Sequence, residues 1–183
     1  MRVRHCGKLE LGGSPTVNKL KVVVLAALLA VAGCKARQQA PLSREIYPEP
    51  AQARTDLADA LKTASTAHKR VLLDFGGNWC GDCRVLDFYF HDAANQALLT
   101  DNYVLVHINV GHMDRNLDIA AKYEVPLDKG VPALAVLNER GELVFSQKDG
   151  QFEAMRTMQP EAVKAFLAEW KPAVPCSTTV VSC

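Results

Sequence analysis

A short, mostly apolar segment at residues 71–75 runs into two glycines and then into a pair of cysteines, Cys80 and Cys83. Apolar, β-prone residues favour a strand, and consecutive glycines favour a tight turn. Residues 84–90 then fit a helix. This stretch therefore predicts a strand, a turn and a helix, with both thiols in the first helical turn.

Two cysteines at this spacing in the first turn of a helix bring their sulfur atoms close enough to form a disulfide. The helix N-terminus stabilises the thiolate of the first cysteine, and a thiolate is the form that attacks a disulfide. We therefore interpret Cys80 as a nucleophile and Cys83 as the thiol that resolves the mixed disulfide. Half of a zinc site and two unreactive buried cysteines are the alternatives.

The residues of this stretch resemble a known family. Residues 74–83, Asp-Phe-Gly-Gly-Asn-Trp-Cys-Gly-Asp-Cys, resemble the active-site segment of the thioredoxin family, and residues 130–133, Gly-Val-Pro-Ala, resemble its cis-proline loop. The resemblance extends over roughly residues 56–170. It implies an α/β, thioredoxin-like fold, with a central mixed β-sheet flanked by helices.

The resemblance also implies roles for single residues. Asp74 matches the acid that assists proton transfer while the second cysteine attacks. Trp79, Val131 and Pro132 match residues that meet the substrate, and Val131 would offer its main chain to the partner peptide. His107 stands where many thioredoxins carry a lysine near the buried acid. It either shares the proton relay with that acid or is an ordinary core histidine.

The rest of the pattern agrees with alternating strands and helices. Apolar spacing and turn residues predict the following elements: a possible edge strand at 46–47, a helix at 55–68 capped by Thr55-Asp56, a strand at 71–75, helical pieces at 84–90 and 92–99, a strand at 103–110, a helix at 114–124, a β-hairpin at 133–147 and a helix at 160–170.

The N-terminal residues fit an export signal. A basic head precedes an apolar run at residues 22–32, and 11 residues are too few to span a bilayer, which needs about 20. The run ends in Val31-Ala32-Gly33-Cys34, which resembles the bacterial lipoprotein box. That resemblance implies cleavage before Cys34 and lipidation of its sulfur, and Lys35 after it favours the outer membrane. An ordinary signal peptide with an incidental cysteine is the alternative.

These features predict four parts of the chain. Residues 1–33 are a signal peptide, whose true start we hypothesise to be Val17, and residues 34–53 are a lipidated N-terminus and tether. Residues 54–171 are the thioredoxin-like domain, and residues 172–183 are a C-terminal tail. In the tail we expect Cys176 and Cys183 to form a structural disulfide. A second redox relay through these two cysteines is the alternative.

The distribution of charged residues limits the kinds of partner that we expect. The first 33 residues hold five of the 21 basic residues and one of the 20 acidic ones. The remainder has 16 basic and 19 acidic residues, a net charge of −3. No basic, aromatic-interleaved surface is therefore expected, and we predict no nucleic-acid partner.

Together these observations predict a thiol–disulfide oxidoreductase of the bacterial cell envelope, periplasmic and held by its lipid. Its expected partners are protein thiols and disulfides, together with a membrane electron donor that would keep it reduced, and we expect no metal and no cofactor. Asp82 departs from thioredoxin itself, which usually has proline there. Its charge beside the thiolate should favour the disulfide, so we expect a reductase or isomerase. A non-enzymatic, peptide-binding or chaperone-like module is the alternative, whereas the spacing does not fit a peroxidase.

Overall fold

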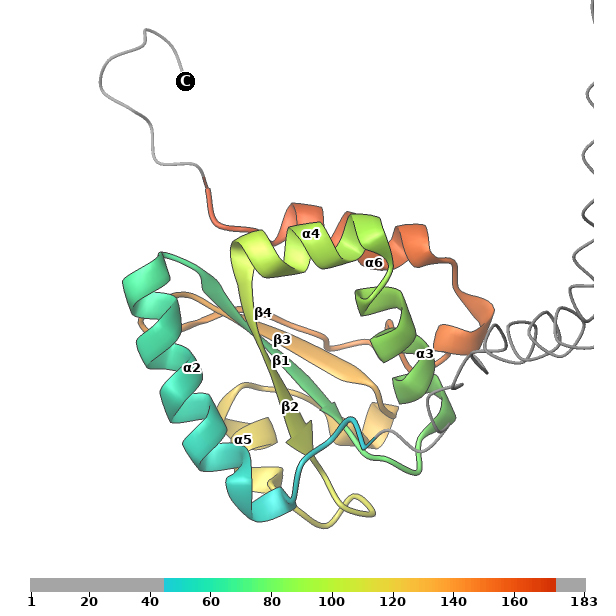
Figure 1. The fold of residues 1–183 in the computed structure, drawn as a ribbon. Helices are drawn as coiled ribbons and strands as arrows, with labels where there is room; N and C mark the ends of the chain where they lie inside the picture. The colour runs from blue at the N-terminus through green and yellow to red at the C-terminus, as the bar shows by residue number, and fades with distance from the viewer. Residues whose placement is uncertain (1–44, 174–183) are drawn as a thin grey trace, which may run out of the picture. The chain divides into compact units, whose positions relative to one another are not determined.

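The computed structural model describes residues 45–173 (Figure 1). The predicted signal peptide with its hypothesised start at Val17, the predicted lipidation site Cys34 and the predicted Cys176–Cys183 disulfide lie outside the described residues.

The described chain forms a four-stranded sheet with helices on both faces (Figure 1). Its strand order is β2-β1-β3-β4, and β1 pairs parallel to β2 and antiparallel to β3. This mixed sheet confirms the predicted α/β class. The elements, in chain order, are η1 (Pro50–Gln52), α2 (Ala53–Ala67), β1 (Arg70–Gly76), α3 (Gly81–Phe90), α4 (Ala93–Asn102), β2 (Tyr103–Asn109), α5 (Leu117–Lys122), η2 (Leu127–Lys129), β3 (Ala133–Leu137), β4 (Leu143–Ser146), η3 (Met155–Thr157) and α6 (Pro160–Glu169).

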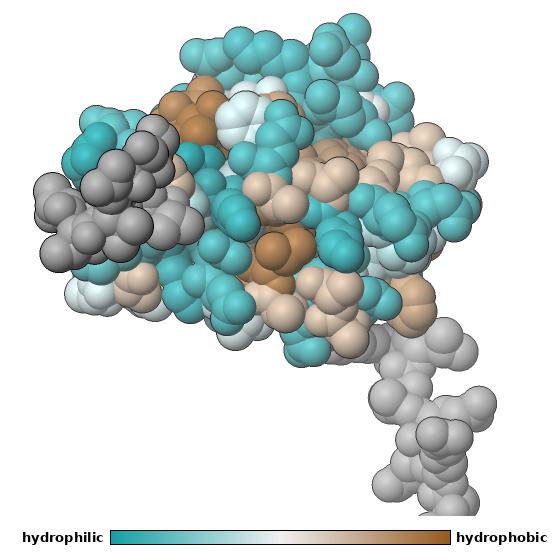
Figure 2. Space-filling model, turned by 90° about the horizontal axis from the view of Figure 1, so that it is seen from above, coloured by the Kyte–Doolittle hydropathy of each residue, from teal (hydrophilic) through white to brown (hydrophobic). Residues whose placement is uncertain are grey.

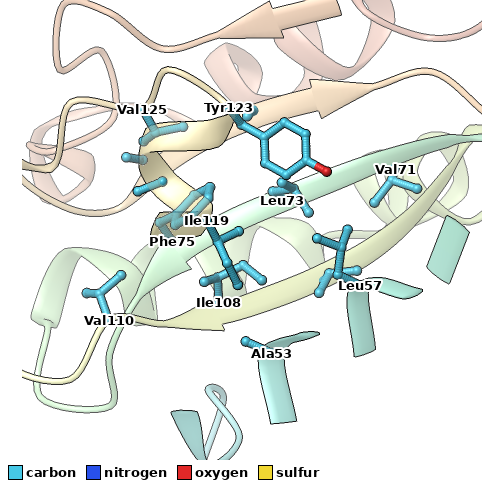
Figure 3. Close-up of a cluster of buried hydrophobic side chains, with 14 of the residues drawn as sticks. Ala53, Leu57, Val71, Leu73, Phe75, Ile108, Val110, Ile119, Tyr123 and Val125 are labelled. Atoms are coloured by element: carbon cyan, nitrogen blue, oxygen red, sulfur yellow. The ribbon is translucent and has the colours of Figure 1, made fainter. Parts of the chain in front are cut away.

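Strand β1 lies in the middle of the sheet and is buried on both faces, as its near-continuous apolar run predicts. Its side chains alternate between the two faces of the sheet and therefore pack into two separate cores. Figure 3 shows the core on the α2 and α5 face, where Leu57 packs with Leu73 and Ile119. The opposite core joins Leu72 of β1 to α3 and α6, including Leu167. Each large apolar side chain buried in this way contributes about 1.5–3 kcal/mol.

The register of β1 places one acidic residue inside the sheet. Asp74 stands opposite His107 of β2 on one side and opposite Leu134 of β3 on the other. Because side chains alternate along a strand, Asp74 shares a face of β1 with Gly76, the last residue of the strand. This is the end of the strand from which the chain turns toward the two cysteines.

Several predicted helix boundaries differ from the structure. Helix α2 begins at Ala53 directly after the 3₁₀-helix η1, so Thr55 and Asp56 lie inside the helix and do not cap it. Proline at the first position of η1 starts the helical turn earlier, because its fixed φ suits a helix start. Helix α5 is also shorter than the predicted 114–124.

Residues 45–50, which we call the strap, were predicted as part of a tether with a possible edge strand at Ile46-Tyr47. The strap forms no strand. Its backbone instead bonds to side chains of the domain, and Tyr47 is buried with 1% of its surface exposed. The packed domain therefore includes the strap and begins before the predicted boundary at residue 54.

The face that carries α4 and α6 is shown in Figure 2, where hydrophobic residues form small patches among hydrophilic ones. A mixed surface of this kind is ordinary for a folded domain in water. Within residues 45–173, no helix has the length and apolar character needed to cross a bilayer.

Candidate redox site

The two cysteines lie where the strand–turn–helix prediction puts them. Cys80 is the N-cap residue of α3, and its sulfur atom accepts a hydrogen bond from the backbone N–H of Cys83 at 3.1 Å. The two residues form a disulfide, with their Cα atoms 5.3 Å apart. An N–H group at a helix N-terminus stabilises negative charge on the sulfur that it contacts. This geometry therefore favours a thiolate on Cys80 once the disulfide is reduced.

The residues predicted to meet a substrate surround Cys80. The carbonyl oxygen of Val131 lies 3.5 Å from the Cys80 sulfur, and the Val131–Pro132 peptide bond is cis. Trp79 is half exposed, and its indole Nε1–H donates to the carbonyl oxygen of Gly111 at 2.5 Å. Its ring stacks on that of His112. The structure thus brings the predicted Trp79, Val131 and Pro132 to the same end of the sheet as the disulfide.

Asp74 is fully buried and holds two polar side chains on one oxygen. Its Oδ2 accepts a hydrogen bond from the Tyr47 hydroxyl at 2.8 Å and lies 2.9 Å from Nδ1 of His107. Its Oδ1 has no hydrogen-bond partner among the described residues. Burial, and then the nearby Asp74 carboxylate, raise the pKa of Tyr47 well above its usual value. Tyr47 therefore stays protonated and acts as a donor.

Gly76 separates this polar cluster from the disulfide. A side chain starting at Gly76 would overlap the Tyr47 hydroxyl and would lie 2.8 Å from the sulfur of Cys83. The phenol and the buried sulfur therefore approach the same point of the β1 backbone from two elements, and glycine allows this close approach. The predicted proton acceptor Asp74, on the same face of β1, belongs to this neighbourhood.

The charge of Asp82 is paired, which changes its predicted effect on the thiolate. Its carboxylate accepts from the Arg156 backbone N–H at 2.8 Å and from the Arg156 Nε–H at 3.1 Å, and Nη2 lies 2.9 Å away. Burial alone would raise the pKa of Asp82, but the Arg156 hydrogen bonds and charge outweigh it and hold that pKa below its usual value. Asp82 therefore stays ionised, and the guanidinium offsets its field at Cys80.

Three residues of the site were not found from the sequence. Tyr47 and Arg156 contact it from the strap and from η3, and Asn78 holds the strap. The signal for Tyr47 was an aromatic residue within a proline-rich segment, which the tether interpretation passed over. Nothing in the local pattern marks Arg156.

The zinc alternative would need further ligands beside the two cysteines. Among residues 45–173, no group of three or more His, Cys, Asp or Glu side chains is arranged to hold a metal ion. The contacts of the two cysteines are instead with each other, with the α3 N-terminus and with Val131.

Known proteins resemble parts of this chain. A family model described as thioredoxin-like matches residues 52–139. A thioredoxin of Pongo abelii is 27% identical over 111 residues, which cover 61% of this chain and 90% of that protein. An isoleucine–tRNA ligase of Saccharolobus solfataricus is 31% identical over 80 residues, but the chain spans only 7% of that enzyme.

A solved structure shows the relationship over a larger share of the chain. The crystal structure of a disulphide isomerase from Xylella fastidiosa Temecula1 is 36% identical, with a TM-score of 0.65. The match covers 69% of this chain and 96% of that one. With its Cys80–Cys83 pair at disulfide distance in a thioredoxin-type disulfide oxidoreductase fold, the chain belongs to the thioredoxin-like family.

Proposed function

We propose that the protein is a thiol–disulfide oxidoreductase of the bacterial cell envelope, which acts from its reduced form to reduce or isomerise disulfides in other proteins. The observation that carries the proposal is the environment of Cys80. Its sulfur accepts a hydrogen bond from the backbone N–H of Cys83 at the α3 N-terminus and lies beside the Val131 carbonyl group. A helix N-terminus is the setting that makes a cysteine a good nucleophile.

The exchange would run in two steps. The Cys80 thiolate attacks one substrate sulfur, forms a mixed disulfide and releases the other substrate sulfur as a thiolate. Cys83 then gives its proton to Asp74 and attacks the Cys80 sulfur, which releases the second substrate thiolate. The cysteine pair supplies both electrons and ends as a disulfide. The substrate thiolates take up two protons, one passed on from Asp74 and one from solvent.

Support for the reduced form as the active one comes from the relative rather than from Asp82. Isomerisation needs a free thiolate to open a wrong disulfide, and the 36% identical structure is described as a disulphide isomerase. The charge of Asp82, on which the sequence argument relied, is offset by Arg156. An electron donor at the membrane would return the Cys80–Cys83 pair to its dithiol form after each reduction.

The envelope location rests on the N-terminal sequence. The apolar run at 22–32 and the Val31-Ala32-Gly33-Cys34 box support export and lipidation, and Lys35 supports the outer membrane. Incorporation of a labelled fatty acid into the wild-type chain, and its loss in Cys34→Ser, is the expected result. Labelling that persists in Cys34→Ser would contradict the anchor.

Trapping experiments test the reaction. In Cys83→Ser the second step is removed, so mixed disulfides between Cys80 and substrate proteins should accumulate, whereas Cys80→Ser should form none and lose the activity. We expect a reduction potential near or below about −230 mV, and a value near −120 mV would mean an oxidant. Full function in Cys80→Ser would instead support the non-enzymatic, peptide-binding module.

A further inference from the structure

We propose that Tyr47 is a positioning residue of the redox site, through which the strap holds the Asp74 carboxylate in place for proton transfer from Cys83. The inference rests on the proposed thiol–disulfide exchange and adds to it a group from outside the strand–turn–helix motif. Tyr47 lies 33 residues before Cys80 in the sequence, in a segment that we predicted to be a tether.

Tyr47 contacts Asp74 and His107 and approaches the resolving cysteine. Its hydroxyl donates to Oδ2 of Asp74 at 2.8 Å. Its ring meets that of His107 edge-on, with centroids 5.2 Å apart. The phenol and the Cys83 sulfur both reach the place where a Gly76 side chain would begin. A single buried side chain thus lies against the acid, the histidine and the region of the resolving cysteine.

The strap that carries Tyr47 is fastened by side-chain amides of the domain. Oδ1 of Asn78 accepts from the backbone N–H groups of Ile46 and Tyr47, and its Nδ2 donates to the Tyr47 carbonyl group at 2.8 Å. Farther along, Asn109 donates to the Pro48 carbonyl group at 2.8 Å. These bonds satisfy backbone groups that have no strand partner. They also fix the position of the Tyr47 backbone, and thereby the position of its phenol beside Asp74.

The charged and titratable groups around Asp74 come from several elements. His107 reaches it from β2, Tyr47 reaches it from the strap, and Cys83 and Asp87 lie on α3, where the Asp87 charge acts on the Tyr47 phenol. From β3 the facing residue is the apolar Leu134. With Tyr47 and His107 both held at Oδ2, the Oδ1 atom, which has no partner among the described residues, is left for the thiol proton.

His107 gives this cluster a way to solvent. It lines an open cavity of about 340 Å³ together with Asp56 and Asp59 of α2. About a fifth of its side chain is exposed, whereas Asp74 is fully buried. A proton taken from Cys83 by Asp74 can therefore leave by way of the imidazole at Oδ2, toward a cavity lined by Asp56 and by Asp59, which pairs with Lys62. Tyr47, which stays protonated, holds the carboxylate and does not carry this proton.

The test compares Tyr47→Phe with the wild type in the full-length chain. Phenylalanine keeps the ring and removes only the donor to Asp74. The reduced protein is mixed with oxidised glutathione, and tryptophan fluorescence follows the two steps over a range of pH. A carboxylate that loses a donor is protonated more easily. In Tyr47→Phe the pH midpoint of the resolving step should therefore rise by about one unit relative to the wild type. At a pH below the midpoints of both proteins, the resolving step of the variant should be about tenfold slower.

Tyr123→Phe is the matched control. Tyr123 is also buried, but its hydroxyl has no hydrogen-bond partner in the described part of the chain. This variant should leave the pH profile unchanged, and the first step should be unchanged in both variants. An unshifted profile in Tyr47→Phe, or an equal shift in Tyr123→Phe, would overturn the inference.

A second readout separates this inference from the proposed function. Turnover on a protein disulfide is measured with the same wild-type preparation. Suppose that Cys83 resolved the mixed disulfide between Cys80 and glutathione in the wild type, but the protein acted on no protein disulfide. The proposed function would then fail, while the Tyr47 comparison remained valid. If turnover were normal and the Tyr47→Phe profile did not move, only the positioning role would be wrong.

Discussion

Asn78 and Tyr47 are joined by hydrogen bonds in both directions, although 31 residues separate them. The Tyr47 N–H donates to Oδ1 of Asn78 at 3.0 Å, and Nδ2 of Asn78 donates to the Tyr47 carbonyl oxygen at 2.8 Å. Asn78 stands two residues before Cys80. The loop that presents the nucleophile and the strap are therefore one connected unit.

Removing the Asn78 side chain should loosen the strap. Asn78→Ala leaves the amides of Ile46 and Tyr47 without their acceptor, and a lost hydrogen bond of a buried group costs about 1–3 kcal/mol. Hydrogen exchange at these two amides should therefore become roughly tenfold or more faster. Asn138→Ala is the control, because Asn138 also accepts from two backbone amides, at the β3–β4 turn. Unchanged exchange at Tyr47 in Asn78→Ala would contradict this account of the strap.

Gly76→Ala should destabilise the protein. The added methyl group would overlap the Tyr47 hydroxyl and approach the Cys83 sulfur to 2.8 Å, and both neighbours are buried. Overpacking of this kind costs about 1–3 kcal/mol. Denaturant unfolding of the oxidised protein measures the loss.

Gly81→Ala provides the comparison for Gly76→Ala. Its methyl group would meet Arg156 atoms only at 3.7 Å or beyond, at the start of α3. Alanine is the better helix former, so this variant should be as stable as the wild type or more stable. Equal stability of the two variants would show that the space beside Gly76 is not restrictive.

Arg156→Gln should make the cysteine pair more reducing. Without the guanidinium, the Asp82 charge acts unopposed on the Cys80 thiolate at the start of α3. The disulfide is then favoured, and the potential should fall by about 15–30 mV, a three- to tenfold change in the equilibrium constant. Asp82→Asn should shift it in the opposite direction. Arg140→Gln, which removes an exposed arginine paired with Glu142, should leave the potential unchanged.

The Asp82–Arg156 pair also predicts a pH dependence of stability. Because Arg156 lowers the pKa of Asp82 in the folded protein, the stabilisation is complete above the ordinary value of 3.8 and is lost as the pH falls through the lowered one. Asp82→Asn should therefore have a lower urea midpoint than the wild type at pH 7. The difference should shrink toward pH 3. A difference that persisted unchanged at pH 3 would assign the effect to packing.

Much of the fold could be predicted from local patterns. The buried run at 71–75, the two glycines and the cysteine spacing specify a strand, a turn and a helix start, because each depends on neighbours only a few residues away. Boundaries were less predictable. Thr55 and Asp56 are residue types that often cap a helix, but the helical conformation already begins upstream of them, in η1 and at Ala53 of α2.

Local sequence signals were sufficient to place the thiols at a helix N-terminus and the acid on the central strand. Packing between elements far apart in the chain set the surroundings of these residues. Tyr47 reaches Asp74 because the side-chain amide of Asn78, 31 residues away, holds a segment without regular structure, and Arg156 reaches Asp82 across 74 residues. Such contacts depend on how folded elements pack, which no local periodicity records. The composition of residues 45–50 therefore suggested a tether, although in the folded protein this segment packs against the domain and forms part of the site.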